Sequence, residues 1–299
     1  MINTSKPRIG THDGSFHADD VFAVATLMLL FPEATVVRTR DDEQLRLCHV
    51  VVDVGGACDP MNEAFDHHFR EGRETPRPNG VEYSSFGLVW KKYGGDLAGS
   101  AEAARMVDER LVQGIDALDN GQGSTQVMPG VEHATLTGVI GLFNGTWDII
   151  TDNDQAFMEA VEVAKLIIKR AVAHARADIA SMKAATIQAD REVVVMPAEF
   201  QGDATPLVTA LTKHPTPKFL VFLATNGEWS VQAVPPNSGD RKFEQRVRFP
   251  AAWDWKRGAD LAALTGVEDA IFSHGAGFFA CAKSREGALK LAHLALTAQ

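Results

Sequence analysis

The sequence predicts an α/β fold in two parts, and three observations support this. In the first half, apolar runs of strand length alternate with apolar stretches of helix length. Residues 50–52 are three consecutive valines, as expected for a parallel strand that is buried on both faces. From residue 152 to about residue 185, apolar residues recur in steps of three and four, which indicates one long amphipathic helix between two domains. Beyond this helix the pattern changes to strands.

Each element has a local signal. Residues 9–12 are a short apolar entry, and the apolar stretch at residues 21–30 predicts a helix that stops at Pro32. β-Branched residues between turn signals predict strands at residues 35–40 and 49–54. The remaining elements are expected as a strand end at residue 65, helices from residue 84 and over residues 106–118, strands at residues 192–196, 219–223 and 229–234, and a last helix after residue 283. Ser84, Ser85 and Ser284 are available as N-cap residues for their helices.

The composition is that of a globular protein with a sizeable core, since 45% of the 299 residues are apolar and 23% are charged. No apolar run reaches the ~18 residues that span a bilayer, and the first residues lack the apolar segment of a secretory signal. We therefore expect a cytoplasmic protein without a membrane partner.

Charge and cysteine content exclude some classes of protein. The net charge of -10 argues against nonspecific coating of nucleic acid, which needs a positive surface, but not against a nuclease whose carboxylates bind metal. The three cysteines, Cys48, Cys58 and Cys281, show no paired spacing, so neither a disulfide framework nor a thiolate zinc site is expected.

Histidine and aspartate follow the predicted strands of the first half. His12 ends the first strand, Asp53 ends the run of valines, and Asp66, His67 and His68 follow the next strand-like run. On their own, three such consecutive residues as Asp66, His67 and His68 usually lie in a solvated loop. The recurrence of such residues at several strand ends indicates a common site, because parallel sheets carry their ligand sites at the carboxyl ends of their strands. Glycines after Asp53 permit a sharp departure of the chain.

Further candidate ligands lie in the loop after the first strand and in the helix predicted at residues 106–118. The loop carries His17, Asp19 and Asp20, and the helix delivers Asp116 and Asp119, whose spacing lets them share one helix face. Mixed carboxylates and imidazoles suit Mn²⁺ or Mg²⁺, and a structural zinc site would contain fewer carboxylates. The number of candidates is enough for two ions with a bridging carboxylate, the arrangement used to cut phosphoester bonds.

A hydrolase of carbon-centred substrates, such as an aminopeptidase, would use a similar metal pair. Basic residues in the second half favour an anionic substrate instead, although a solvated surface explains at least half of them equally well. They are Arg241, Lys242, Arg246, Arg248, Lys283 and Arg285. The turn that contains His274, Gly275 and Gly277 suits either a bound phosphate or an ordinary glycine-rich turn before a helix capped by Ser284.

Six motifs occur in a fixed order along the chain. They are THDGSFHADD at residues 11–20, VDVGG at 52–56, FDHH at 65–68, SSFG at 84–87, DALDNG at 116–121 and SREGA at 284–288. Together they resemble the melanocyte-proliferating-gene (MYG) exonuclease family, a branch of the DHH phosphoesterase superfamily. The resemblance covers essentially the whole chain.

The resemblance implies an N-terminal parallel-sheet domain of the DHH type, with helices on both faces and the metals, and a smaller mixed α/β domain that contacts substrate. We expect these at residues 1–150 and 189–299, connected by a long helix at residues 151–188. The implied activity is hydrolysis of phosphodiesters that depends on two divalent ions, Mn²⁺ foremost and Mg²⁺ second, with a metal-activated hydroxide as nucleophile. The implied substrate is RNA or a short oligonucleotide trimmed from 3′ to 5′, and a homodimer is an expected assembly.

Roles are carried over residue by residue. Asp53 is expected to bridge the ions, and His68 is expected nearer the substrate than the metals. The implied metal ligands are His12, His17, Asp19, Asp53, Asp66, His67, Asp116 and Asp119, with the choice between Asp116 and Asp119 left open. We expect His68, Asp20, Lys283 and Arg285 as catalytic residues, and the substrate-binding residues that we expect are His274, Gly275, Gly277, Arg246 and Arg248.

Two alternatives stay open at this point. One is a hydrolase of a small anion, such as pyrophosphate or a cyclic dinucleotide. The other is a metal-binding regulatory protein without turnover, against which the intact set of ligands argues.

Overall fold

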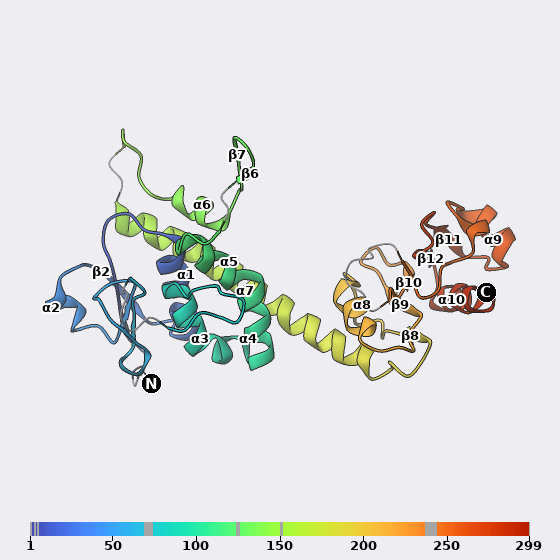
Figure 1. Ribbon diagram of the computed structural model, residues 1–299, viewed down its shortest axis with the longest axis horizontal. Helices are drawn as coiled ribbons and strands as arrows, with labels where there is room; N and C mark the ends of the chain where they lie inside the picture. The colour runs from blue at the N-terminus through green and yellow to red at the C-terminus, as the bar shows by residue number, and fades with distance from the viewer. Residues whose placement is uncertain are drawn as a thin grey trace. The chain divides into compact units, whose positions relative to one another are not determined.

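The computed structural model describes residues 2, 4, 6–68, 74–123, 126–149, 152–236 and 244–298. The chain forms two compact units, an N-terminal unit at Met1–Arg176 and a C-terminal unit at Ala177–Gln299 (Figure 1). The long helix predicted from the three- and four-residue spacing is α7 (Asn153–Thr186), which contributes residues to both units. None of the described helices is long and apolar enough to cross a bilayer.

A five-stranded sheet forms the centre of the N-terminal unit, in the order β2-β1-β3-β5-β4. The strands are β1 (Arg8–Thr11), β2 (Thr35–Arg38), β3 (Val50–Val52), β4 (Cys58–Asp59) and β5 (Ala64–Phe65). β1 pairs in parallel with β2 and β3, and β3 pairs in parallel with β5, whereas β4 is antiparallel to β5. The carboxyl ends of β1, β3 and β5 therefore meet at one edge of the sheet.

Two helices contact strands of this sheet. α1 (Ala18–Leu30) is buried from Ala18 to Leu27, so it is a core helix and not a surface helix with one apolar stripe. α3 (Ser85–Ala98) contacts α1, and the rings of Phe22 and Phe86 lie 5.3 Å apart between them. The N-termini of both helices point their first residues at the polar strand ends.

The helix expected at residues 106–118 is interrupted. α4 (Ala101–Val107) passes into a π-helical turn (Asp108–Val112) and then into α5 (Gln113–Asp119). A short hairpin follows, with β6 (Gln126–Met128) and β7 (Val131–Glu132), and then α6 (Leu136–Gly141). The unit also contains one short helix, α2 (Asp42–Leu45), and a 3₁₀ turn (Pro60–Asn62).

The C-terminal unit contains a second five-stranded sheet, in the order β11-β12-β10-β9-β8. Its strands are β8 (Val193–Val195), β9 (Phe219–Leu223), β10 (Trp229–Ala233), β11 (Ala270–Ser273) and β12 (Phe279–Ala282). β8 and β9 are parallel and the other pairs are antiparallel, so the sheet is mixed. The α/β class predicted from the sequence is confirmed.

Helices cover both faces of β9, which explains why its five residues are all apolar. Phe219 and Val221 share a core with Leu291 of α10 (Arg285–Thr297). Leu220 and Phe222 share another with Leu211 of α8 (Thr205–Thr212). Successive side chains of a strand point to opposite faces, so the continuous apolar run places one set in each core. α9 (Gly258–Thr265) contacts β11 at the edge of the sheet.

Candidate metal centre

The strand ends bring the predicted ligands together. His12 follows β1, Asp53 follows β3, and His67 comes two residues after β5. Asp53 adopts a left-handed backbone conformation with φ 58°, followed by Gly55 and Gly56 at φ 90° and 78°. A left-handed conformation at a residue other than glycine is uncommon and concentrates at functional sites. Here it turns the chain sharply while the Asp53 side chain stays buried at the strand end.

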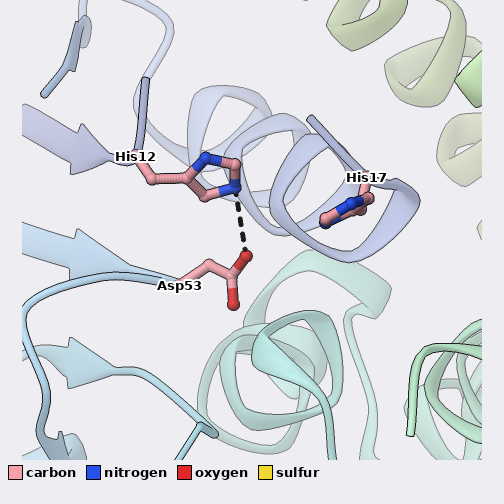
Figure 2. Close-up of side chains that lie close together, drawn as sticks. All are labelled: His12, His17 and Asp53. Carbon is pink, nitrogen blue, oxygen red and sulfur yellow. Dashed lines mark ion pairs between the residues drawn. The ribbon is translucent and has the colours of Figure 1, made fainter. Parts of the chain in front are cut away.

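Figure 2 shows the first group of side chains, in which His12 and Asp53 project from neighbouring strands and His17 from the start of α1. One ligand atom from each of the three lies within 4.8 Å of the others. Nε2 of His12 lies 3.4 Å from Oδ2 of Asp53.

A second group contains Asp53, His67 and His68, within the same 4.8 Å limit. Nε2 of His67 lies 3.4 Å from Oδ1 of Asp53, the carboxylate oxygen that does not contact His12. The two histidines differ in exposure, because 10% of the His67 side chain and 61% of the His68 side chain are accessible. Oδ2 of Asp53 therefore faces the first group, and its Oδ1 faces the second group.

The third group contains His17, Asp19 and Asp119. His67 joins it to the second group, since its Nε2 lies 3.1 Å from Oδ2 of Asp119 and 3.5 Å from Oδ2 of Asp19. Among the residues that the structure describes, these three groups contain seven side chains, because Asp53 and His17 are each shared by two groups.

The charges of this cluster fit a bound cation. Asp19, Asp20 and Asp53 are buried, and in the described part of the chain Oδ1 of Asp19 has no hydrogen-bond partner. Burial, together with the carboxylates of Asp53, Asp119 and Asp20, raises the pKa of Asp19. A buried carboxylate among other carboxylates is costly unless a positive charge accompanies it. Imidazole with carboxylate is a donor set for a divalent ion such as Mn²⁺.

Two histidines of this cluster, His12 and His67, have raised pKa values. Burial disfavours the charged form of His12, but the hydrogen bonds that its ring donates to the carboxylates of Asp20 and Asp53 outweigh this effect and raise its pKa to about 10. Burial also disfavours the charged form of His67, but its hydrogen bonds to the carboxylates of Asp119 and Asp53 outweigh this effect and raise its pKa to about 11. Burial would raise the pKa of Asp53, yet its contacts with His12 and His67 hold the pKa below its usual range.

Asp20 and Asp66 orient other members of the cluster. Oδ1 of Asp20 accepts the backbone N–H of His17 at 2.9 Å, and its Oδ2 lies 3.2 Å from Nε2 of His12. Oδ1 of Asp66 contacts Nδ1 of His68 at 2.8 Å, and its Oδ2 accepts the N–H of Gly56. Both carboxylates are already engaged by protein groups.

Asp116 and Asp119 lie on the same helix, α5, but their carboxylates contact different partners. Asp116 is fully buried, and its Oδ1 accepts hydrogen bonds from the hydroxyl of Ser84 at 2.5 Å and from the N–H of Gly87 at 3.0 Å. Its Oδ2 forms an ion pair with the guanidinium of Arg77 at 2.8 Å. The pKa of Asp116 is raised to about 6 by burial, against the effect of Ser84 and Arg77. Asp119 contacts His67 and lies in one group with His17. Of Asp116 and Asp119, it is therefore Asp119 that belongs to the cluster of candidate metal ligands.

Ser85 contributes to the site in a way that the sequence did not indicate. Its hydroxyl donates to Oδ1 of Asp53 at 2.9 Å, and its N–H donates to Oδ2 of Asp19 at 3.3 Å. Ser84 occupies the N-cap position of α3 as expected, but its hydroxyl donates to Asp116 and makes no side-chain cap. Ser284, by contrast, accepts the N–H of Gly287 and caps α10 as expected.

The remaining predicted site residues lie in the C-terminal unit. The guanidinium of Arg246 donates to the backbone carbonyls of Thr212, His214 and Pro217, which fixes the end of α8. Arg248 pairs with Asp254 at 2.8 Å and donates to the carbonyl of Gly275.

His274, Gly275 and Gly277 form the turn between β11 and β12, where the His274 ring lies 4.6 Å from that of Trp255. Lys283 and Arg285 are exposed at the start of α10. Arg241 and Lys242 lie outside the described residues.

Comparison with known proteins confirms the family that the motifs resemble. The family model MYG1_exonuc, described as "Uncharacterised protein family (UPF0160)", matches residues 8–296. The chain belongs to this family. It is 32% identical to the MYG1 exonuclease of Homo sapiens in an alignment of 328 residues that covers 97% of this chain and 86% of the human protein.

Two further relatives extend the family. The MYG1 exonuclease of Bos taurus is 31% identical in an alignment of 327 residues that covers 97% of this chain and 84% of the bovine protein. The MYG1 protein of Dictyostelium discoideum is 27% identical over 313 residues, which cover 95% of this chain and 94% of that protein. No solved structure matches the chain with comparable significance.

Proposed function

We propose that this chain is a divalent-metal-dependent nuclease of the DHH type, a 3′–5′ exonuclease that acts on RNA or short oligonucleotides. The position of Asp53 carries the proposal, because its two carboxylate oxygens face two different histidine groups. A carboxylate shared in this way is suited to bridge two ions. Family membership and the printed name of the mammalian relatives support nuclease chemistry.

Six side chains would hold the ions, with Mn²⁺ the preferred metal and Mg²⁺ second. They are His12, His17, Asp19, Asp53, His67 and Asp119. Asp20 is proposed to orient His12, and Ser85 to orient Asp53. Asp66 and Asp116 are left out of this set because protein groups already engage their carboxylates. Bound here, divalent ions supply an acidified water and neutralise the charge that develops on the phosphate.

His68 is proposed to act on the substrate. Its Nδ1 lies 2.8 Å from Asp66, which leaves Nε2 on the other side of an exposed ring to contact substrate. A histidine oriented by a carboxylate can donate a proton to the leaving oxygen. Lys283 and Arg285 are proposed to neutralise other phosphates of the strand.

A substrate panel tests the proposal. Purified protein with Mn²⁺ or Mg²⁺ is incubated with single-stranded RNA, single-stranded DNA, a dinucleotide and pyrophosphate. We expect stepwise release of mononucleotides, abolished by Asp53→Asn and retained by Asp96→Asn, which changes an exposed aspartate on α3. No product from the wild type, or the same product from Asp53→Asn, would refute the proposal. Faster turnover of pyrophosphate than of any nucleic acid would support the small-anion alternative.

A further inference from the structure

The candidate metal ligands line a hollow of 520 Å³ at the end of α5. Four residues of its wall belong to the candidate metal centre or to the proposed catalytic set, namely His17, His67, His68 and Asp119. The wall also contains Leu118, Asn120 and Thr137, for which the proposed chemistry gives no role. A substrate whose phosphate lies among the metal ligands therefore meets these three side chains as well.

Of these three side chains, that of Asn120 offers substrate an accessible polar atom. Leu118 is apolar, and Oγ1 of Thr137 is a buried oxygen without a hydrogen-bond partner. Oδ1 of Asn120 is not among the buried oxygens, and within the part of the chain that the structure describes no group donates a hydrogen bond to it. Asn120 thus places a free acceptor in the wall, next in sequence to the candidate ligand Asp119.

The amide group of Asn120 is held in one orientation. Its Nδ2 donates to the backbone carbonyl of Asp116 at 3.0 Å, and the backbone N–H of Asn120 donates to the same carbonyl at 3.0 Å. Because a carbonyl only accepts hydrogen bonds, the NH₂ group must face it and Oδ1 must lie on the other side of the amide. An acceptor fixed in this way is pre-organised, which lowers the entropic cost of binding a donor.

The chemistry of an amide oxygen selects the part of the substrate that it can bind. Phosphate oxygens accept hydrogen bonds as the amide oxygen does, so the phosphate itself is not its partner. The sugars on either side of a phosphate in RNA carry 2′-hydroxyl groups, which donate hydrogen bonds and are absent from DNA. A free acceptor beside the metal ligands is therefore suited to a ribose.

We propose that Oδ1 of Asn120 accepts a hydrogen bond from a ribose 2′-hydroxyl next to the scissile phosphate, and that this contact favours RNA over DNA. The inference rests on the proposed nuclease function and adds to it the residue that recognises the sugar. The hydroxyl belongs to one of the two residues that the scissile phosphate joins, and the experiment distinguishes between them.

The test compares kcat/KM for RNA oligonucleotides that differ in a single sugar. One is ribose throughout, a second has 2′-deoxyribose in its 3′-terminal residue, and a third has it in the residue before. For the wild type, one of the two deoxy substrates should show a kcat/KM about 3- to 10-fold lower, as expected for the loss of one hydrogen bond. A 2′-fluoro group at that position should lower kcat/KM equally, because it keeps a ribose-like sugar conformation but donates no hydrogen bond.

Asn120→Leu keeps a side chain of similar size without the acceptor, and Asn120→Ala removes both. Each should abolish the preference by slowing only the substrate with ribose throughout. Damage to the fold or to the neighbouring Asp119 slows all substrates and leaves the ratios unchanged, so the ratio reports the sugar contact. Thr137→Val alters the wall of the same hollow at a buried hydroxyl and should keep the preference.

The outcomes separate this inference from the proposed function. Equal kcat/KM for the three substrates in the wild type overturns the sugar contact and leaves the nuclease function intact. A 2′-fluoro substrate that is cleaved as fast as the ribose substrate also overturns it, since the conformation of the sugar would then explain the preference. A preference that persists in both Asn120 variants overturns the role of Asn120. Cleavage of no substrate by the wild type overturns the proposed function and, with it, this inference.

Discussion

The hydroxyl of Ser85 donates a 2.9 Å hydrogen bond to Oδ1 of Asp53 at the start of α3. Ser85 is buried and its backbone N–H also reaches Asp19, so one helix N-terminus fixes two carboxylates of the candidate metal centre. The free N–H groups and the dipole at a helix N-terminus favour negative charge at this position. The orientation of Asp53 toward both histidine groups therefore depends on α3 as well as on β3.

Replacing Ser85 by alanine tests this dependence. Loss of the hydroxyl removes a hydrogen bond from Oδ1 of Asp53, and loss of such an orienting partner typically reduces metal affinity or activity about 10- to 100-fold. The measurement is a Mn²⁺ titration of Ser85→Ala beside wild type. Ser100→Ala is the control, because Ser100 caps α4 by accepting the N–H of Ala103 and should affect stability alone, by about 1 kcal/mol. Equal affinity of Ser85→Ala and wild type would remove Ser85 from the site.

Glycine is predicted to be required at position 87 because a larger side chain would collide with Asp116, and not because the backbone there needs the conformational freedom of glycine. A Cβ at this position would lie 2.0 Å from Oδ2 of Asp116, so alanine must displace a buried carboxylate. Overpacking of this kind costs about 1–3 kcal/mol of the free energy of unfolding. Gly95→Ala on the same helix is a matched control with nothing within 4 Å of the new Cβ, and it should stabilise the helix by about 0.5–1 kcal/mol. Urea unfolding measures both, and an equal effect of the two variants would contradict the packing.

Metal binding is predicted to release protons. His12 and His67, with pKa values raised to about 10 and 11, are protonated at neutral pH in the metal-free chain, whereas a ligand imidazole must be neutral. Apparent Mn²⁺ affinity should therefore rise between pH 6 and pH 9. Calorimetry in two buffers of different ionisation enthalpy counts the released protons. An affinity that does not change with pH would show that these histidines do not exchange protons for metal.

The same pKa shifts affect the stability of the metal-free chain. A histidine whose pKa is raised by folding contributes stability that is fully present below the unfolded-state pKa, near 6.5. This contribution decreases as the pH rises through the folded pKa, about 10 for His12. Chelator-treated protein should thus be less stable at pH 10 than at pH 6 by chemical unfolding, and the difference should shrink in His12→Ala.

Lys283 and Arg285 are predicted to bind the substrate backbone. Each contact with a phosphate displaces about one counterion, so Lys283→Ala or Arg285→Ala should raise KM and reduce the salt dependence of kcat/KM by about one unit of slope. Lys169→Ala removes the same charge from an exposed position of α7 and is the control. Salt dependence that stays the same in all variants would exclude a phosphate contact by these residues.

Much of the N-terminal architecture could be predicted from the sequence because local pattern and site chemistry coincide there. Consecutive valines predict a buried parallel strand, and the topology of parallel sheets then predicts that His12, Asp53 and His67 meet. The ends of α7 and β9 were predicted to within a residue or so because the periodicity is long in one case and the apolar run is bounded in the other.

Other features depend on contacts between distant residues. The separation of Asp116 from Asp119 follows from Arg77 and Ser84, which precede Asp116 by more than thirty residues. Ser84 and Ser85 were expected as caps from their local position, yet their hydroxyls donate to carboxylates of other elements. Arg246 was expected to bind substrate because of its charge, but three backbone carbonyls engage its guanidinium. No local pattern contains these partners.

The most direct test of the central claim combines metal content with cleavage in the isosteric variant Asp53→Asn. The account predicts that wild-type protein binds two Mn²⁺ ions per chain and releases mononucleotides from RNA. Asp53→Asn should keep its fold by circular dichroism but lose bound Mn²⁺ and lose the activity together. An Asp53→Asn protein that binds and cleaves as the wild type does would contradict the assignment of Asp53 as the carboxylate shared by two metal ions.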